Sequence, residues 1–541
     1  RSIGNYSLDA LTSADANVAV GYQAGSAVTT GIYNTLVGYQ SGLATTEGAQ
    51  NTFLGRVAGG ANTTGGVNIA IGDGAYDAAD TESNNLAVGV NALGGAVAGG
   101  EFNVAVGNTS LDALTSADSN VAVGYRAGSG ITTGEQNVII GKDAMLVATT
   151  SNYNVVVGSN AGVAMTTGSN NNTLIGIESG RSLTTGDNNV ALGSEALGGA
   201  SGASTESNNM AIGVNALKAA INGGEFNVAV GNNTLDALTS ADSTVAIGYN
   251  AGTAITSGLG NTLVGFEAGK TLATGTENVM VGLLAGSQAT GNGNVFLGFK
   301  AGEDTTSGTN NVAVGNLALD DATSESNNVA IGRLSMAGPV NGGEQNVAVG
   351  ANTLDALTSA DSNVAVGYNA GTALTTGGLN VFVGAGAAEL GVVTGTSNVG
   401  VGYEALKDLT NATRTVAVGF RALQNLTTGT ASIGIGGNAG EGITTGGSNI
   451  CIGDQAGATF DTETDNMFIG VSSGNGNIAG GEQNVGIGNL TLDGLTGGDH
   501  NTAIGYNSMS ANNMSGNDNT AVGFQAGNGI VGGAENTIMG K

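Results

Sequence analysis

The stretch that decides the fold is NVAVGYQAG at residues 17–25, because near copies follow at 34–42 (NTLVGYQSG) and 120–128 (NVAVGYRAG). Counted from the Asn, or from the residue in its place, the chain holds 31 copies, nearly always 17 or 18 residues apart. A fixed period of this length is typical of a solenoid, in which each repeat forms one coil. We call the Asn position 0 of its coil and number the following positions from it.

Composition and charge exclude several other classes of protein. The 541 residues include 98 Gly and one Pro, but 40% are hydrophobic and stand at fixed positions, which argues against a disordered chain. No Pro-rich or charged linker divides the chain, so we predict a single continuous shaft over 1–541. The net charge of −29 argues against a nucleic-acid partner. The chain contains no run of about 20 apolar residues, so the sequence predicts no insertion into a membrane.

Positions +1 to +3 are apolar or Thr, and position +4 is Gly in every copy. A helix would not tolerate Gly at this density, whereas short β-branched runs bounded by Asn and Gly are typical of strands. The sequence therefore predicts an all-β fold, a parallel β-solenoid (β-roll) of about 31 coils with ~17 residues per coil and coils about 4.8 Å apart. We expect a second strand near position +11, at Val28, Ile131, Leu183, Ile255, Leu374 and Ile443.

The Asn and Gly positions have separate physical explanations. The Gly at +4 can adopt positive φ where the strand must turn. The Asn suits a turn, and stacked Asn side chains can form a hydrogen-bonded ladder along the coils. The predicted structural ladder comprises, in the first copies, Asn17, Asn34, Asn51 and Asn68 with the corner glycines Gly21, Gly38, Gly55 and Gly72.

The residue at position +2 predicts an oligomer. Alternate side chains of a strand face opposite ways, and here neither face is polar, because position +2 never carries a charge or an amide. We take a 17-residue coil to be too thin to supply a second layer of its own, so this face should contact another chain. The predicted inter-chain face comprises Ala19, Leu36, Phe53, Phe296 and Phe382. Closed cyclic symmetry with like faces inward favours a parallel homotrimer.

At this level of detail the motif has a known counterpart. The pattern Asn/Ser-Val-Ala-Val/Ile-Gly-x-x-Ala resembles the β-roll head repeats of trimeric autotransporter adhesins, and NVAVGYxAG…TTG…N resembles repeats of bacteriophage tail fibres. The resemblance covers essentially the whole chain. It implies a trimeric extracellular fibre, on a virion or a cell surface, that attaches to a host or surface through a receptor or glycan that the sequence does not identify. The chain departs from the adhesins in its longer period and in having no heptad stalk or anchor barrel.

A longer periodicity lies above the coil. LDALTSAD at 8–15, 111–118, 235–242 and 354–361, with LDGLTGGD at 492–499, marks blocks beginning near residues 1, 103, 227, 346 and 484. Before the last four blocks stand TES, SES or TET motifs followed by GGE. These segments are either a recurrent ligand or cation site or a recurring acidic turn, and we favour the turn.

The sequence predicts no catalytic, cofactor or metal site. Cys451 occupies an apolar position, His500 stands in a turn beside Asp499, and acidic residues recur at turns without a unique cluster. Calcium stays an unsupported alternative, because neither the RTX nonapeptide nor the EF-hand loop is present. We therefore predict a protein that is not an enzyme. Because the chain begins at Arg1 without an initiator Met or a signal peptide, we interpret it as a processed or trimmed piece.

Two alternatives to an attachment fibre stay open. Bare solenoid ends could stack and build a head-to-tail filament. The TTG repeats could present a threonine array that binds ice, and a strip of aromatic residues could bind carbohydrate. That strip comprises Tyr22, Tyr39, Tyr125, Tyr249, Phe266, Tyr368 and Phe420.

Overall fold

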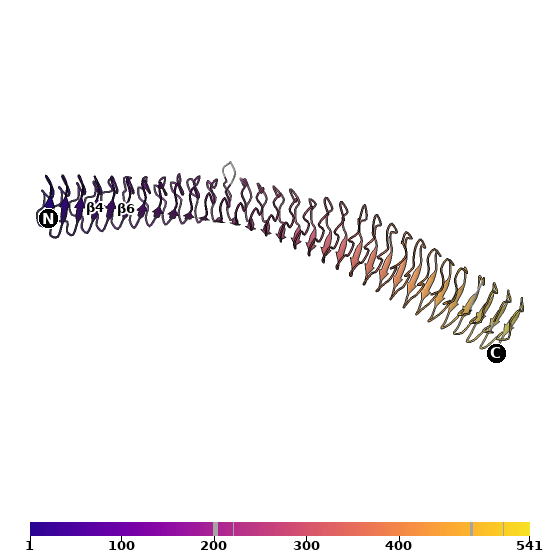
Figure 1. Ribbon diagram of the computed structural model, residues 1–541. Coiled ribbons are helices and arrows are strands. Elements are labelled where there is room, and N and C mark those ends of the chain that lie inside the picture. Colours follow the sequence, from indigo (N-terminus) through magenta and orange to yellow (C-terminus); the bar gives the residue numbers. More distant parts are fainter. Residues whose placement is uncertain (199–203, 220, 477–479, 512) are drawn as a thin grey trace. The chain divides into compact units, whose positions relative to one another are not determined.

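The computed structural model is a parallel β-solenoid with about 17 residues per coil, as the repeat predicts, and it contains no helix among the described residues. These are residues 1–198, 204–219, 221–476, 480–511 and 513–541. Contacts group the chain into two units, 1–277 and 278–541, which are described separately below. Within each unit, consecutive three-residue strands lie side by side (Figure 1). The prediction of one uninterrupted shaft over 1–541 stays a prediction.

The first unit contains strands β1 to β16. Their bounds are β1 (Ser2–Ile3), β2 (Val18–Val20), β3 (Thr35–Val37), β4 (Thr52–Leu54), β5 (Ile69–Ile71), β6 (Leu86–Val88), β7 (Val104–Val106), β8 (Val121–Val123), β9 (Val138–Ile140), β10 (Val155–Val157), β11 (Thr173–Ile175), β12 (Val190–Leu192), β13 (Met210–Ile212), β14 (Val228–Val230), β15 (Val245–Ile247) and β16 (Thr262–Val264). Within this unit each strand pairs in parallel with its neighbour along the chain, so that Ala19 lies beside Leu36 and Leu36 beside Phe53.

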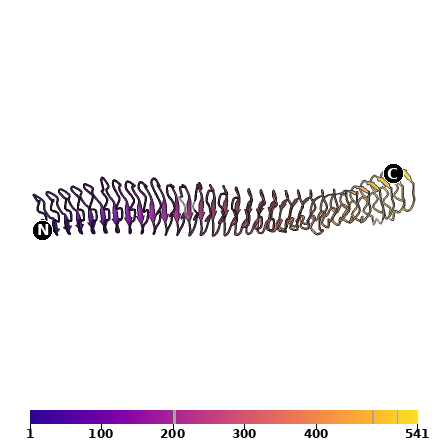
Figure 2. The ribbon, with the colours of Figure 1, turned by 90° about the horizontal axis from the view of Figure 1, so that it is seen from above.

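The second unit contains strands β17 to β32 in the same arrangement. Their bounds are β17 (Val279–Val281), β18 (Val295–Leu297), β19 (Val312–Val314), β20 (Val329–Ile331), β21 (Val347–Val349), β22 (Val364–Val366), β23 (Val381–Val383), β24 (Val399–Val401), β25 (Val416–Val418), β26 (Ile433–Ile435), β27 (Ile450–Ile452), β28 (Met467–Ile469), β29 (Val485–Ile487), β30 (Thr502–Ile504), β31 (Thr520–Val522) and β32 (Thr537–Met539). Seen from above, each strand is followed by a loop that returns to the next strand (Figure 2).

The Gly at +4 turns the chain at the end of each strand. Gly21 has φ +138° and Gly38 has φ +144°, values that side chains rarely allow. A Cβ on Gly21 would also lie 2.6 Å from the carbonyl carbon of Gly38 in the next coil. The position is therefore restricted twice, by backbone conformation and by close approach of the neighbouring coil, which explains why no copy departs from Gly.

The Asn at position 0 joins adjacent coils and also closes its own coil. Asn34 donates its backbone N–H to Oδ1 of Asn17 at 2.8 Å, and Asn51 donates to Oδ1 of Asn34 at 2.9 Å. The side-chain Nδ2 of Asn34 donates to the carbonyl oxygen of Gly48 at 2.8 Å, fourteen residues later in the same coil. The ladder thus differs from simple side-chain stacking, because each Asn side-chain amide forms hydrogen bonds with the backbone of two segments. All of these Asn side chains are buried, so both bonds form away from water.

The buried ladder is interrupted at Thr415, whose hydroxyl is buried and has no hydrogen-bond partner. We predict that Thr415→Asn raises the stability to unfolding by about 1–2 kcal/mol, since it adds two buried hydrogen bonds, to Gly429 O and from the Ser432 N–H. Thr428→Asn, an exposed control in the same coil, should change stability by less than about 0.5 kcal/mol. Urea unfolding followed by circular dichroism compares the two variants, and equal stabilities would contradict this prediction.

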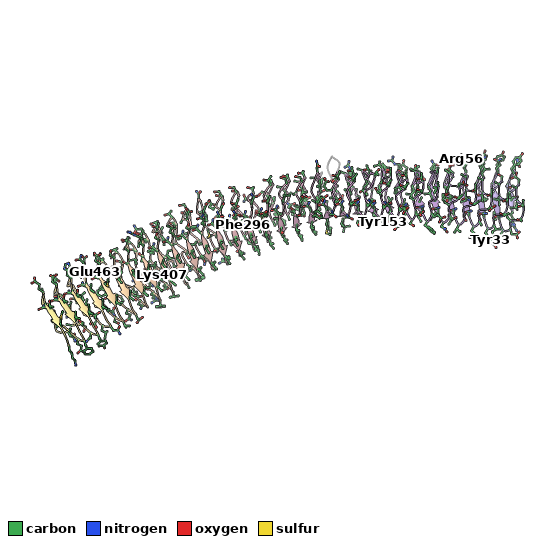
Figure 3. All side chains as sticks on the ribbon, turned by 180° about the vertical axis from the view of Figure 1, so that it is seen from behind. Tyr33, Arg56, Tyr153, Phe296, Lys407 and Glu463 are labelled. Atoms are coloured by element: carbon green, nitrogen blue, oxygen red, sulfur yellow. The ribbon has the colours of Figure 1, made fainter. Side chains whose placement is uncertain are left out.

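The core lies inside each coil, and this corrects the predicted inter-chain face. Ala19, Leu36, Phe53, Phe296 and Phe382 are all 0% exposed within a single chain, and Figure 3 shows Phe296 among the side chains along the ribbon of its unit. Side chains with no exposed surface cannot also contact another chain, so the prediction for these residues is wrong. The reason is that the coil does supply a second layer, built from its residues at +7, +8 and +11.

Positions +2 and +8 fill this core in a complementary way. Phe53 at +2 accompanies Gly59 at +8, and a Cβ on Gly59 would lie within 2.7 Å of the Phe53 ring. In other coils +2 is small and +8 is large: Ala105 accompanies Leu111, which is fully buried with φ +48°. The left-handed backbone at +8 is therefore the same for Gly and Leu. The two kinds of coil differ in whether the side chain at +2 or the one at +8 fills the core.

The second strand predicted near +11 is absent from the described residues. Val28 is fully buried, but the next backbone N–H groups, those of Thr29, Thr30 and Gly31, all point to one carbonyl oxygen, that of Thr46. An extended strand would spread these bonds over successive carbonyls, so the segment is a turn. Three isolated bridges, at Leu183–Ser204, Leu374–Val393 and Leu495–Met514, are the strand-like contacts in this region.

Candidate functional site

The outward side of the strands forms a uniform apolar surface in each unit. We call the first and third residues of strands β2 to β32 the strand columns. Every residue of the first column is Val, Ile, Leu, Met or Thr, and every residue of the second is Val, Ile, Leu or Met. These side chains are half-buried or exposed, as at Ile69 and Ile71, each 41% exposed. Each unit therefore carries an unbroken apolar stripe, which sequence reasoning assigned to the wrong side of the strand.

The acidic TES and GGE motifs form a hydrogen-bonded contact between two coils. Glu82 is 4% exposed, and its Oε2 accepts the backbone N–H groups of Asp80 and Thr81 at 3.1 and 3.0 Å. Its Oε1 accepts the N–H of Gly99, in the next coil, at 2.8 Å. The same hydrogen bond, from the Gly N–H to Oε1 of the Glu, recurs in three other pairs: Glu206 with Gly223, Glu325 with Gly342 and Glu463 with Gly480.

This contact explains why the two motifs recur together. The coil that contains Gly99 is one residue longer than the usual 17, from Asn85 to Asn103, and Gly99 has φ +107° at that point. The buried carboxylate of Glu82 satisfies the backbone N–H group of Gly99 in this longer coil. Both carboxylate oxygens are bonded within the chain, which supports the structural reading of these segments as turns.

A second, interrupted ladder, which sequence reasoning missed, runs two residues before the Asn in part of the coils. The Oδ1 of Asp118 accepts the backbone N–H of Glu101 at 2.7 Å, and Oδ1 of Asn152 accepts that of Glu135 at 2.7 Å. The recurrence of Asp, Asn and Ser at this position was the available signal. Acidic residues are frequent here because a carboxylate is a good acceptor for a backbone N–H of the preceding coil.

Reactive groups do not converge in the described part of the chain. No group of three His, Cys, Asp or Glu side chains there could hold a metal ion. Cys451 is fully buried, and burial raises the pKa of its thiol to about 12. His500 lies 3.6 Å from Asp518 at an exposed turn. Asp320 has a pKa raised to about 6, first by desolvation and then by the charges of Glu303 and its acidic neighbours.

The first threonine of each TTG repeat forms a hydrogen bond to the next coil. The hydroxyl of Thr29 donates to the carbonyl oxygen of Thr46 at 3.3 Å, and that of Thr46 donates to Thr63 O at 3.2 Å. The same bond recurs at Thr115, Thr132 and Thr427. The first Thr of each motif thus joins adjacent coils, whereas the second, such as Thr30 or Thr133, is exposed, so the alternative of a threonine array that binds ice rests on the second Thr alone.

Aromatic residues at +5 form exposed stacks on one edge of the coils. Tyr22 and Tyr39 stack with ring centroids 5.3 Å apart and planes 15° apart. The other stacked pairs are Tyr249 with Phe266, Tyr403 with Phe420, and Tyr506 with Phe524. Arg56 occupies the same +5 column, and Figure 3 places it on the edge of the first unit opposite Tyr33. Tyr125 and Tyr368 stand in this column too, half exposed, without an aromatic neighbour at the +5 positions of the adjacent coils.

Comparison with known proteins identifies no relative: no protein-family model matches the chain, and no curated protein matches it either. The described residues contain no helix that is long and apolar enough to span a membrane.

Proposed function

We propose that the chain is a structural, non-catalytic segment of an extracellular fibre on a virion or a cell surface, which serves attachment to a host or surface. In this proposal three parallel copies pack through their strand columns. The observation that carries the proposal is the strand columns themselves, which hold no charged side chain from β2 to β32. A long exposed apolar stripe on a soluble protein marks an interaction surface.

The size of the stripe supports a contact between copies. Each unit has 16 strands. With about 4.8 Å between strands and about 10 Å along three residues, one unit presents roughly 750 Å². Stable protein interfaces bury about 800 Å² per partner, so one unit alone reaches that size. A second copy has the same coil spacing, which allows the apolar side chains of the two copies to interlock in register along the whole stripe.

The remaining surface supports an extracellular shaft. The acidic groups lie mainly at turns away from the strand columns, and most cationic side chains are held in ion pairs such as Arg56 with Asp73 and Lys218 with Glu195. A net charge of −29 keeps shafts apart sideways once the apolar stripe is covered. A solenoid also tolerates gain or loss of whole coils, which suits a protein whose length matters more than a unique cleft.

The mass of the native particle tests the proposal. Light scattering should give three times 52.3 kDa for the chain. A mass of one chain would contradict it, and a mass that grows with concentration beyond three chains would replace the trimer with an end-to-end filament.

A pair of variants tests the face. Val121→Glu with Val123→Glu in the first unit, combined with Val364→Glu with Val366→Glu in the second, places charges in the strand columns of both units and should reduce the particle to one chain. The control variant, Thr133→Glu with Gln136→Glu and Thr376→Glu with Leu379→Glu, adds the same charge at exposed turns of the same two coils and should leave the mass unchanged. Circular dichroism confirms that both variants keep the β-solenoid. Equal masses for the two would show that the strand columns are not the interface.

A further inference from the structure

One of the stacked aromatic pairs is combined with an ordered polar network. Tyr403 and Phe420 occupy position +5 of successive coils, with ring centroids 5.5 Å apart and planes 11° apart, and each is 49% exposed. Because coils are about 4.8 Å apart, rings at this distance stack along the direction in which the coils repeat. The outer face of Phe420 therefore points toward position +5 of the following coil.

Position +5 of that following coil is Gly437, which has no side chain to cover Phe420. A Cβ added to Gly437 would have only Asp454 atoms within 4 Å, with Oδ1 at 2.6 Å, so it would not touch the Phe420 ring. Asp454 stands at +5 one coil further and is exposed. The backbone levels of Phe420 and Asp454 are thus two coils apart, about 9.6 Å, and the Asp454 carboxylate reaches back to the level of Gly437, one coil from the Phe420 ring.

A guanidinium group is fixed beside the Phe420 ring. Glu404 is 8% exposed and accepts hydrogen bonds from Lys407 Nζ at 2.8 Å, Arg421 Nε at 2.9 Å and Gln424 Nε2 at 3.1 Å. The Cζ of Arg421 lies 4.9 Å from the centroid of the Phe420 ring. Its Nε is used by Glu404, while its two terminal amino groups have no acceptor among the described residues. They are therefore prearranged donors at the edge of an aromatic face.

Two other aromatic sites, at Tyr249 with Phe266 and at Tyr125, do not have this combination. At Tyr249 and Phe266 the adjacent polar contact is Asn250 Nδ2 to Glu267 Oε1 at 3.4 Å, with Lys270 on Glu267. At Tyr125 the neighbouring Arg126 lies over a single ring and is paired with Asp143. The pair at Tyr403 and Phe420 differs from these two sites in offering a ring face, fixed donors and an acceptor together.

We propose that Phe420, Arg421 and Asp454 form a binding site for one neutral pyranose ring of a saccharide. The C–H face of the sugar lies on Phe420, the Arg421 amino groups donate to hydroxyl or ring oxygens, and the Asp454 carboxylate accepts from a hydroxyl group. A neutral sugar is favoured over an acidic one because the chain carries −29 and Asp454 faces the gap. The proposal deepens the attachment role and rests on it for its biological purpose.

Saturation-transfer NMR on the whole chain tests the site, with the methyl glycosides of glucose, galactose, mannose and N-acetylglucosamine as separate probes. We expect saturation of the ring protons of at least one probe. Phe420→Ala should abolish that signal, and Arg421→Lys should reduce it at least threefold. The matched control Phe266→Ala removes an equally exposed ring from another stack and should leave the signal unchanged.

Three outcomes would overturn the site: no transfer to any of the four probes, transfer that survives Phe420→Ala, or stronger transfer to methyl glucuronide, an acidic comparator. The particle mass of the same samples separates this proposal from the previous one. Loss of sugar binding at trimer mass contradicts only the sugar site, whereas sugar binding by a single chain contradicts only the trimer.

Discussion

Gly158→Ala is expected to destabilise the chain by roughly 3 kcal/mol or more, although it adds a single methyl group. The added Cβ would lie 2.6 Å from the carbonyl carbon of Gly176 in the next coil, and nearer still to its oxygen. Both atoms belong to the backbone and are held by inter-coil hydrogen bonds, including Gly176 N to Val157 O at 2.8 Å. Gly158 also has φ +145°, so alanine would be strained even if the coils moved apart.

Urea unfolding and amide hydrogen exchange around residues 155–176 measure this effect. The control is Gly529→Ala, because Gly529 has no positive φ and an added Cβ there would have no atom within 4 Å. That variant should stay within about 0.5 kcal/mol of the parent. Similar losses in the two variants would mean that composition, rather than close approach at the corner, explains the invariant Gly.

Phe53→Ala is expected to destabilise the chain by about 3–5 kcal/mol, because it leaves a cavity at the centre of a coil that can collapse around it only in part. Phe53 is fully buried, and its ring lies against Gly59 of the same coil. Gly59→Leu alone should also destabilise the chain, because its side chain would overlap that ring.

The double variant Phe53→Ala with Gly59→Leu should recover most of the loss. It recreates the arrangement of Ala105 and Leu111, and Gly59 already has φ +60°, close to the +48° of Leu111. A residual deficit of about 1 kcal/mol is expected from a left-handed leucine. A double-mutant cycle of unfolding free energies measures the coupling between the two sites. Additive losses would show that +2 and +8 do not share one space in the core.

Much of the fold could be predicted from the sequence because its signals are local. The period, the strand and the corner glycine all follow from residues within one repeat, and NVAVG already contains a strand with its two turns. The orientation of that strand was predicted wrongly, since a tripeptide such as Val18–Val20 is apolar on both sides. A usable signal was present in the pairing of Phe53 with Gly59 and of Ala105 with Leu111, where a large residue at one of +2 and +8 accompanies a small residue at the other.

The candidate sites were less predictable because they depend on contacts between coils. Glu82 and Gly99 are 17 residues apart, which in a solenoid means that they are neighbours, but their hydrogen bond depends on how the extra residue is accommodated. The network around Glu404 joins side chains from two coils in the same way. Tyr403 and Phe420 could be recognised as one strip from spacing, whereas the gap at Gly437 could not.

The amino-acid sequence alone determined that this protein is a parallel β-solenoid, since a 17-residue period with Asn at the start of each strand and Gly at its end allows the backbone few other conformations. Only the tertiary structure decided which side of each strand is inside. Position +2 faces inward because the loop of the same coil closes over it with residues at +7, +8 and +11, and this closure leaves positions +1 and +3 as the apolar outer surface. Which side becomes the core is a property of coil closure, and no property of the tripeptide itself distinguishes the two sides.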